Sequence, residues 1–307
     1  MVTIPDPTRL PQIAITADVR GRSPWRAAGA RFVRNRAALW SLIALVLVLI
    51  FAAVGPLVAA WSNQDIDWAV IGQVATAGQP ALANGHYFGT DDLGRDLFAR
   101  TVQGTQISMM VGIVGATIAV LIGTLYGAIS GYVGGRVDSL MMRIVDILLA
   151  IPYMFVLILL LVIFGRSILM LFVGIGVLSW LEMARIVRGQ TLSLKNMEFV
   201  EAAVATGVRP LRIVLRHIIP NLLGVVVVYA TLLVPNMILY ESFISFLGLG
   251  VQEPQTSLGA LIAAGSSQMQ YGTLWQIGFP LFIFIVVLFS LYFVGDGLRD
   301  ALDPKDR

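Results

Sequence analysis

Residues 198–220 read EFVEAAVATGVRPLRIVLRHIIP and predict a short helix, a tight turn and a second helix. The alanines favour a helix, and Gly207 is free to adopt the positive φ that a tight turn needs. Pro210 suits the start of the second helix, where its missing N–H would have no helical partner anyway. Three arginines then recur at helical spacing on one face: Arg209, Arg212 and Arg216. The stretch therefore predicts a short, rigid two-helix knob with a basic face.

The chain around this knob is too apolar for a soluble domain. Its 307 residues are 57% hydrophobic and 13% charged, with a mean hydropathy of +0.83. A bilayer core about 30 Å thick requires about 20 apolar residues per helix. Segments of that kind predict an all-α membrane protein with six transmembrane helices, at residues 37–61, 107–132, 140–164, 168–186, 218–246 and 274–294. The fourth is the shortest apolar run and must continue through Glu182 to cross.

The basic residues predict the orientation of these helices. With both termini inside, only Arg95, Arg100 and Arg166 of the 21 lysines and arginines fall outside, as the positive-inside rule requires. The overall charge of +3 thus needs no nucleic-acid partner. The chain divides into an inner tail, 1–36, a membrane domain, 37–294, with an outer loop, 62–106, and an inner loop, 187–217, and an inner tail, 295–307.

The first tail and the spans contain further patterns. Trp25 and Phe32 stand among four arginines, which fits either an amphipathic helix on the inner membrane face or a basic tail that only sets topology. In the second span a small residue at every fourth position predicts a groove for a neighbouring helix: Gly115, Ala119, Gly123, Gly127 and Gly131. Pro152, Pro235 and Pro280 are expected to bend or loosen the third, fifth and sixth spans.

The knob resembles the EAA loop of ABC importer permeases. The matching positions are Glu201, Ala202, Ala203, Gly207 and Pro220, whereas His217 and Ile219 depart mildly from the family pattern. Four more stretches agree with the peptide and nickel branch of these permeases: HYFGTDDLGRDLFAR (86–100), GYVGGRVDSLMMRIVD (131–146), ESFISFLGLG (241–250) and GDGLRDALDP (295–304). Within that branch, MARIVRGQTLSLK (183–195) and the C-terminal residues look closest to the second membrane subunit of oligopeptide permeases.

This resemblance implies a type I ABC importer permease with the MetI-like fold, placed in a bacterial inner membrane with both termini cytoplasmic. It implies a heterodimer with a second, homologous permease subunit, two cytoplasmic ATPase subunits and an external peptide-binding protein. In the family the knob docks in a groove of the ATPase, so the matching Glu201 and Gly207 are expected to couple ATP hydrolysis to the spans. Arg209 and Arg212 would contact that groove where it is acidic. ATP and Mg are then bound by the partners, and no cofactor is expected on this chain.

Charged residues near the spans have two interpretations each. Glu241, toward the outer end of the fifth span, and Glu182, near the inner end of the fourth, either face the transport pathway or form ion pairs at an interface. In the outer loop we expect a surface ion-pair cluster that shapes the loop or meets the binding protein, formed by Asp91, Asp92, Arg95, Asp96 and Arg100.

Other functions fit the sequence less well. There is no cysteine, and His86 and His217 are far apart, so disulfides, thiol chemistry and a histidine-rich metal site are not expected. GTDDLGRD has Arg95 and Asp96 where a phosphate-binding loop needs Lys and Ser or Thr. Gly174 and Gly176 lie inside an apolar span, so they do not begin a dinucleotide-binding motif.

The rival classes lack their expected features too. An ion-coupled secondary transporter would need intramembrane carboxylate or histidine relays, and often has two similar halves. A receptor would need a large sensing domain. The sequence shows neither such relays and halves nor a large sensing domain. The partners expected are therefore peptide, lipid and protein subunits. Within the permease interpretation the cargo stays open among oligopeptide, dipeptide and nickel.

Overall fold

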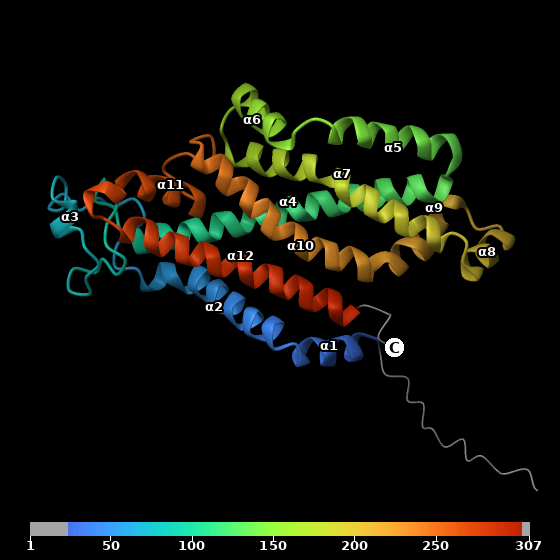
Figure 1. The fold of residues 1–307 in the computed structure, drawn as a ribbon, viewed down its shortest axis with the longest axis horizontal. Coiled ribbons are helices and arrows are strands. Elements are labelled where there is room, and N and C mark those ends of the chain that lie inside the picture. The colour runs from blue at the N-terminus through green and yellow to red at the C-terminus, as the bar shows by residue number, and fades with distance from the viewer. Residues whose placement is uncertain (1–23, 303–307) are drawn as a thin grey trace, which may run out of the picture.

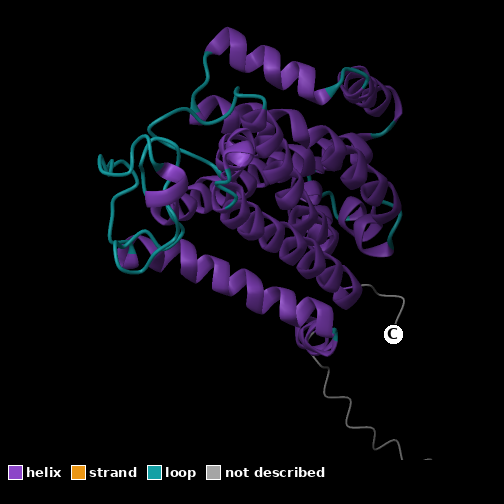
Figure 2. Ribbon diagram, turned by 60° about the vertical axis from the view of Figure 1, so that its left-hand side comes forward, coloured by secondary structure: helices purple, strands orange, loops and turns teal. Residues whose placement is uncertain are grey.

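A computed structural model describes residues 24–302, which form an elongated helical bundle with its loops gathered mainly at one end (Figures 1 and 2). Five helical segments are long and apolar enough to cross a membrane, or six if a bent pair counts as one span. The main helices are α1 (Pro24–Arg34), α2 (Arg36–Val58), α4 (Leu97–Val133), α5 (Gly135–Leu149), α6 (Tyr153–Phe164), α7 (Ile168–Leu194), α10 (Ile219–Phe246), α11 (Leu258–Gln268) and α12 (Trp275–Leu302). Shorter pieces are α3 (Val74–Ala77), α8 (Glu198–Ala205), α9 (Pro210–Ile213), a π-helical turn (Val214–Ile218) and a 3₁₀ turn (Met269–Tyr271).

Helices α4 and α7 form the centre of the bundle, because the small residues of α4 let α7 approach closely. A Cβ added at Gly123 would lie 2.6 Å from the Cβ of Met183 and 2.7 Å from the carbonyl oxygen of Trp180. One at Gly131 would lie 2.9 Å from the carbonyl oxygen of Arg188. The predicted groove along the second span is therefore confirmed, and α7 fills it.

Helices α2 and α12 lie at the periphery, beside one another (Figure 1). Only 17% of the most apolar stretch of each is buried, against 56% for α4 and 50% for α7. Such exposed apolar surface suits lipid or another membrane subunit. Helix α1 lies against α12, where the Phe32 ring is 3.2 Å from a Cβ built on Gly297. The first part of the predicted inner tail, residues 1–23, and residues 303–307 at the other end lie outside the described residues.

The third span is not the single helix predicted for residues 140–164. It is broken into α5 and α6, whose axes differ by 78°. The break falls at Pro152, which has no N–H to continue the helix and instead caps the start of α6. Helix α5 is held against the bundle by ion pairs from Asp138 to Arg188 and from Asp146 to Arg185, each 2.6 Å. Only one of the three prolines therefore breaks its span, since Pro235 and Pro280 lie within the continuous helices α10 and α12.

Other boundaries also differ from the predictions. Helix α4 begins at Leu97 rather than 107, because the Asp96 carboxylate caps it by accepting a hydrogen bond of 2.8 Å from the N–H of Ala99. Helix α11 was not predicted, and it packs against α12 and α10 at the loop end of the bundle. At the other end, α8 and α9 stand beside the end of α7 (Figure 1).

Candidate functional site

The knob predicted from residues 198–220 is present as α8, a turn and α9. Gly207 has φ +76°, and its N–H donates to the carbonyl oxygen of Val204 at 2.9 Å. The Val208 N–H reaches back to the carbonyl oxygen of Ala203 at 3.1 Å, which closes the C-terminal end of α8. Pro210 is the first residue of α9. The local chemistry therefore folds as the sequence indicated, with glycine at the only positive φ of the turn.

One face of the knob is anchored in the apolar core. Val200 of α8 and Ile213 of α9 are only 2% and 1% exposed, and Ile218 of the π-helical turn is fully buried. They pack in one cluster with Met183 and Val187 of α7. The knob is therefore packed directly on α7, and its backbone continues through the π-helical turn into α10.

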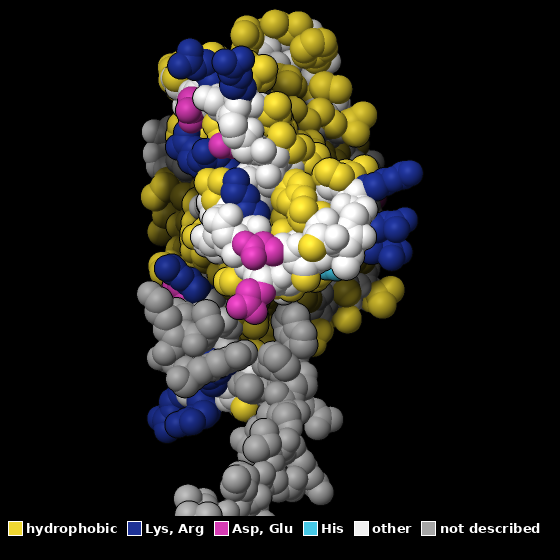
Figure 3. Space-filling model, turned by 90° about the vertical axis from the view of Figure 1, so that its right-hand side faces the viewer, with side chains coloured by type: hydrophobic (Ala, Val, Ile, Leu, Met, Phe, Trp, Pro, Cys, Tyr) yellow, Lys and Arg dark blue, Asp and Glu magenta, His cyan; other side chains and the backbone are white. Residues whose placement is uncertain are grey.

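The opposite face of the knob is exposed and carries both apolar and charged side chains. Figure 3 views this end and shows acidic and basic side chains interspersed with hydrophobic ones. Within residues 24–302 no ion pair engages the exposed side chains of Glu201, Arg209 or Arg212. Among the family-matching positions, Ala202 and Pro220 are exposed, whereas Ala203 is buried. The face combines unpaired charge with Val204, Leu211 and Leu215, as a docking surface does.

Beside the knob lies a hollow of about 610 Å³ between α8, the last turn of α4 and the end of α7. Glu201 lines it from α8, Tyr132 from α4 and Lys195 from the end of α7. The hollow leaves Glu201 accessible from outside the bundle. A partner element that entered it would contact the knob and the bundle together.

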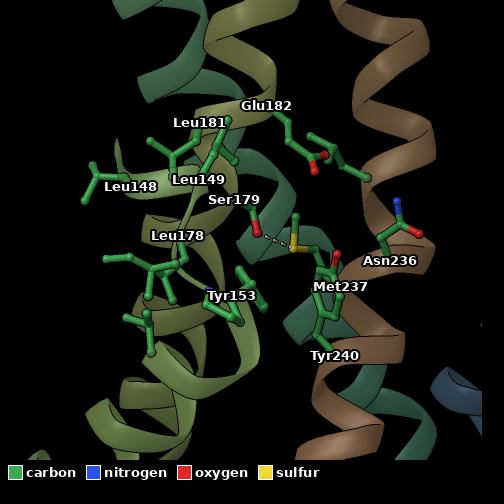
Figure 4. A pocket seen from close by; sticks show the side chains of 14 residues that line it. Leu148, Leu149, Tyr153, Leu178, Ser179, Leu181, Glu182, Asn236, Met237 and Tyr240 are labelled. Atoms are coloured by element: carbon green, nitrogen blue, oxygen red, sulfur yellow. Dashed lines mark hydrogen bonds between the residues drawn. The ribbon is translucent and has the colours of Figure 1, made fainter. Parts of the chain in front are cut away.

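A second feature is a groove between α7 and α10, inside the spans (Figure 4). A cavity of about 200 Å³ is lined by α5, α6, α7 and α10, and another of about 240 Å³ by α7 and α10. Glu182, Leu233 and Asn236 line both cavities, so the two are neighbouring parts of one groove. Glu182 is exposed within the chain. Contact of an ionised carboxylate with hydrocarbon is unfavourable, so contact of Glu182 with lipid is disfavoured.

Glu241 does not reach any such groove, so its predicted interpretation as a pathway-facing residue is wrong for this structure. It is 0% exposed. Its carboxylate accepts hydrogen bonds from the hydroxyls of Ser108 on α4 at 3.0 Å and Ser245 at 2.6 Å. Ser108 in turn accepts the N–H of Leu258 at 3.2 Å. Glu241 thus joins α10, α4 and α11 from within, a role that follows from partners far apart in sequence.

The outer-loop charges form a network that is more buried than predicted. Asp91 is 6% exposed and Arg100 is 3% exposed, while Arg95 bonds to Asp91 at 2.7 Å. Glu253, from the loop before α11, binds Arg95 at 2.8 Å and Arg100 at 3.0 Å. A surface cluster is therefore wrong for most of these residues, although Asp92 is exposed. Sequence reasoning missed Glu253 because it lies 158 residues from Arg95.

The electrostatics of this network are set by burial and by its arginines. Burial alone would raise the pKa of the Glu253 carboxyl, but Arg100 and Arg95 outweigh it and hold that pKa below its usual value. Asp96 behaves in the opposite way, since burial raises its pKa despite hydrogen bonds from Ala99 and His86. The imidazole of His86 is itself fully buried, 2.9 Å from Asp96. These residues tie the outer loop to the start of α4.

No group of three or more His, Cys, Asp or Glu side chains is arranged to hold a metal ion in the described part of the chain. The features that stand out are therefore the exposed knob face and the transmembrane groove.

Two family models match the sequence. The first, described as a binding-protein-dependent transport system inner membrane component, matches residues 119–307 and includes the knob and the groove. The second, the N-terminal TM domain of oligopeptide transport permease C, matches residues 23–73.

The chain is also similar to curated proteins over nearly its whole length. It is 56% identical to the oligopeptide transport system permease protein OppC of Escherichia coli K12, over 94% of each chain. It is 54% identical to the protein of the same name from Haemophilus influenzae, over 94% of this chain and 91% of the relative. The dipeptide transport system permease protein DppC of Bacillus subtilis is 40% identical over 98% of this chain and 89% of the relative.

Among solved structures, the inward-facing MetNI methionine ABC transporter matches with a TM-score of 0.51 and 19% identity. The match covers 66% of this chain and 95% of that chain. At this identity the likeness concerns the fold alone, and it agrees with the predicted MetI-like arrangement.

Proposed function

Because the chain belongs to the family of binding-protein-dependent transport system inner membrane components, we propose that it is the membrane-spanning permease subunit of an ATP-driven oligopeptide importer. The relatives with 54% and 56% identity are named oligopeptide permease subunits, which supports an oligopeptide cargo. The dipeptide and oligopeptide subunits of Bacillus subtilis, at 40% and 41% identity, do not distinguish the two cargoes. ATP and Mg are bound on separate ATPase subunits. This chain supplies part of the pathway and the mechanical link to them.

In the proposed assembly the α8 end faces the cytoplasm and the α11 end faces outside, in the inner membrane of a bacterium. The distribution of the basic residues supports this, since Arg95, Arg100 and Arg166 alone of the 21 fall on outer segments. Both termini are then cytoplasmic. A second permease subunit completes the pathway, an external binding protein delivers peptide, and two ATPase subunits lie beneath the knobs.

The observation that carries the proposal is the two-sided construction of the knob. Its inner face is packed against α7 through Val200 and Ile213, while Arg209 and Arg212 on its outer face form no ion pair within residues 24–302. An element built in this way can contact a partner on one face and move together with the spans through the other. When ATP closes the ATPase pair, motion of the knob turns α7 and α10 and switches the pathway between its two openings.

The test is uptake of labelled dipeptide, tripeptide and pentapeptide, with nickel as a control cargo, in cells with and without this gene. We expect loss of pentapeptide uptake and its recovery when the intact gene is returned. Loss of dipeptide or nickel uptake with normal pentapeptide uptake would replace the proposed cargo. Unchanged uptake of every cargo would reject an import function.

The contact with the ATPase is tested separately by co-purification. Arg212→Glu reverses one exposed charge of the knob without touching its buried face. We expect less ATPase to be retained, with the loss varying with salt because exposed charges are screened. Equal retention by the variant and the wild type at every salt concentration would show that this face is not the contact.

A further inference from the structure

The groove between α7 and α10 contains an exposed carboxylate, that of Glu182, without a protein partner among residues 24–302. The two carboxylates in these helices have opposite surroundings. Glu241 is buried among serine hydroxyls, whereas Glu182 has no hydrogen bond or ion pair with any residue in the range 24–302. A carboxylate inside a membrane protein is normally paired or faces water. Glu182 is exposed in the groove and is therefore open to a cationic counterpart from outside this chain.

The arginines nearest to Glu182 along α7 are already engaged. Arg185, one turn further on, binds Asp146 of α5 at 2.6 Å. Arg188, on the following turn, forms two hydrogen bonds of 2.6 Å with Asp138. Both side chains hold α5 in place, so neither is available to neutralise Glu182. Its negative charge is thus directed into the groove (Figure 4).

The other walls of the groove suit a cationic group. The rings of Tyr153 and Tyr240 lie with centroids 4.4 Å apart on one side of the groove, and aromatic faces attract cations. The side-chain oxygen of Asn236 accepts the hydroxyl hydrogen of Tyr292 at 2.8 Å, which leaves its amide N–H groups to donate to a peptide carbonyl. Acceptor, donor and aromatic surface therefore occur side by side, in a space the size of one side chain.

We propose that Glu182 binds an ammonium group of the peptide during its passage, either the α-amino group or a lysine side chain. The inference rests on the proposed import function. The ammonium group leaves its hydration behind on entering the spans, and the Glu182 carboxylate replaces part of it through charge-assisted hydrogen bonds. A single carboxylate without a second charged partner holds this group weakly enough for release.

The test uses the complete transporter in proteoliposomes, with its partner permease, ATPases and binding protein. The initial uptake rate is measured with the binding protein saturated by each cargo, so that recognition by the binding protein does not limit the rate. The cargoes are a pentapeptide with neutral side chains, the same peptide with one lysine, and that peptide with the lysine acetylated. Glu182→Gln keeps the shape of the side chain and removes its charge, while Asp300→Asn makes the same chemical change on the exposed end of α12.

We expect Glu182→Gln to lower the uptake rate about tenfold and Glu182→Asp to recover part of it. If Glu182→Gln lowers the uptake rate of all three cargoes, the group bound by Glu182 is the α-amino group. If it lowers the rate of the lysine cargo alone, the group is the lysine side chain. Asp300→Asn should transport all three normally. Uptake by Glu182→Gln equal to the wild type for every cargo would overturn the proposal. Loss of the partner permease from the purified variant would overturn it too, because Glu182 would then be an interface residue.

A contact measurement separates this inference from the proposed function. The chain has no cysteine, so Ile186→Cys places a single thiol in the groove. A peptide carrying a thiol-reactive group should label Cys at this position, and adding Glu182→Gln should reduce labelling about tenfold. Labelling that Glu182→Gln does not change would contradict the ammonium site even where import is normal. Absence of uptake by the wild-type complex would reject the import function itself.

Discussion

Replacement of Gly123 by alanine tests the packing of α4 on α7. The added Cβ would lie 2.6 Å from the Cβ of Met183, which is 0.8 Å less than the 3.4 Å at which ordinary contact begins. It would also lie 2.7 Å from the carbonyl oxygen of Trp180. Neither atom is the flexible end of a side chain, so the two helices must separate. Overpacking of this kind costs about 1–3 kcal/mol.

The assay is thermal unfolding of the purified complex, where this loss corresponds to a fall in Tm of roughly 2–6 °C. Gly112→Ala is the first comparison, because the three atoms nearest to its added Cβ belong to the side chains of Ile238 and Val234 and not to the backbone. The fall in Tm should be smaller for Gly112→Ala than for Gly123→Ala. Gly224→Ala is the second, because its Cβ would meet nothing within 4 Å. Equal Tm values for Gly123→Ala and Gly224→Ala would refute the close approach of α4 and α7.

Three further predictions concern the charged residues. Asp91→Asn leaves the buried Arg100 with Glu253 as its one remaining carboxylate partner among residues 24–302, and should cost about 3 kcal/mol of unfolding free energy in denaturant titration. Glu253 has a lowered pKa in the folded state, so its stabilisation, under about 1 kcal/mol, is complete above its unfolded pKa of about 4.3 and disappears as the pH falls through the folded pKa. The Tm difference between wild type and Glu253→Gln should therefore vanish in acid. Asp138→Asn removes the partner of Arg188 and should let α5 move from α7, measured as a longer spin-label distance.

The Asp91 and Asp138 predictions each have a matched control variant. Asp92→Asn alters an exposed neighbour of Asp91 and should change the unfolding free energy by less than about 0.5 kcal/mol. Asp146→Asn removes the exposed pair with Arg185 and should move α5 less than Asp138→Asn does. An unchanged α5–α7 distance in Asp138→Asn, or a Tm difference for Glu253→Gln that persists in acid, would contradict the corresponding prediction.

The features predicted correctly depend on local chemistry. Five of the six apolar segments are single helices long enough to span, as span length predicts. The positive φ at Gly207 and the start of α9 at Pro210 follow from the backbone limits of glycine and proline. The close packing along α4 follows from a repeat of small residues at helical spacing.

The features that were missed depend on contacts between distant parts of the chain. Glu253 meets Arg95 only after the bundle has brought the loop before α11 to the start of α4. Glu241 is buried because Ser108, 133 residues away, supplies a hydroxyl. The break of the third span was underestimated, since a proline indicates that a helix is disturbed but the angle depends on what α5 and α6 pack against.

The central claim is that the knob passes ATPase motion to the spans, and Gly207 offers the most direct test. A Cβ there would meet nothing within 4 Å, so a substitution causes no steric clash. Any effect on transport then arises from the positive φ at this position. Uptake per ATP hydrolysed should decrease from glycine to asparagine, alanine and valine, since asparagine tolerates this conformation best and β-branched valine least. Complex assembly should persist, and Gly189→Val, on a helical glycine with equally open surroundings, should transport normally. Normal uptake per ATP by Gly207→Val in the assembled complex would contradict the claim.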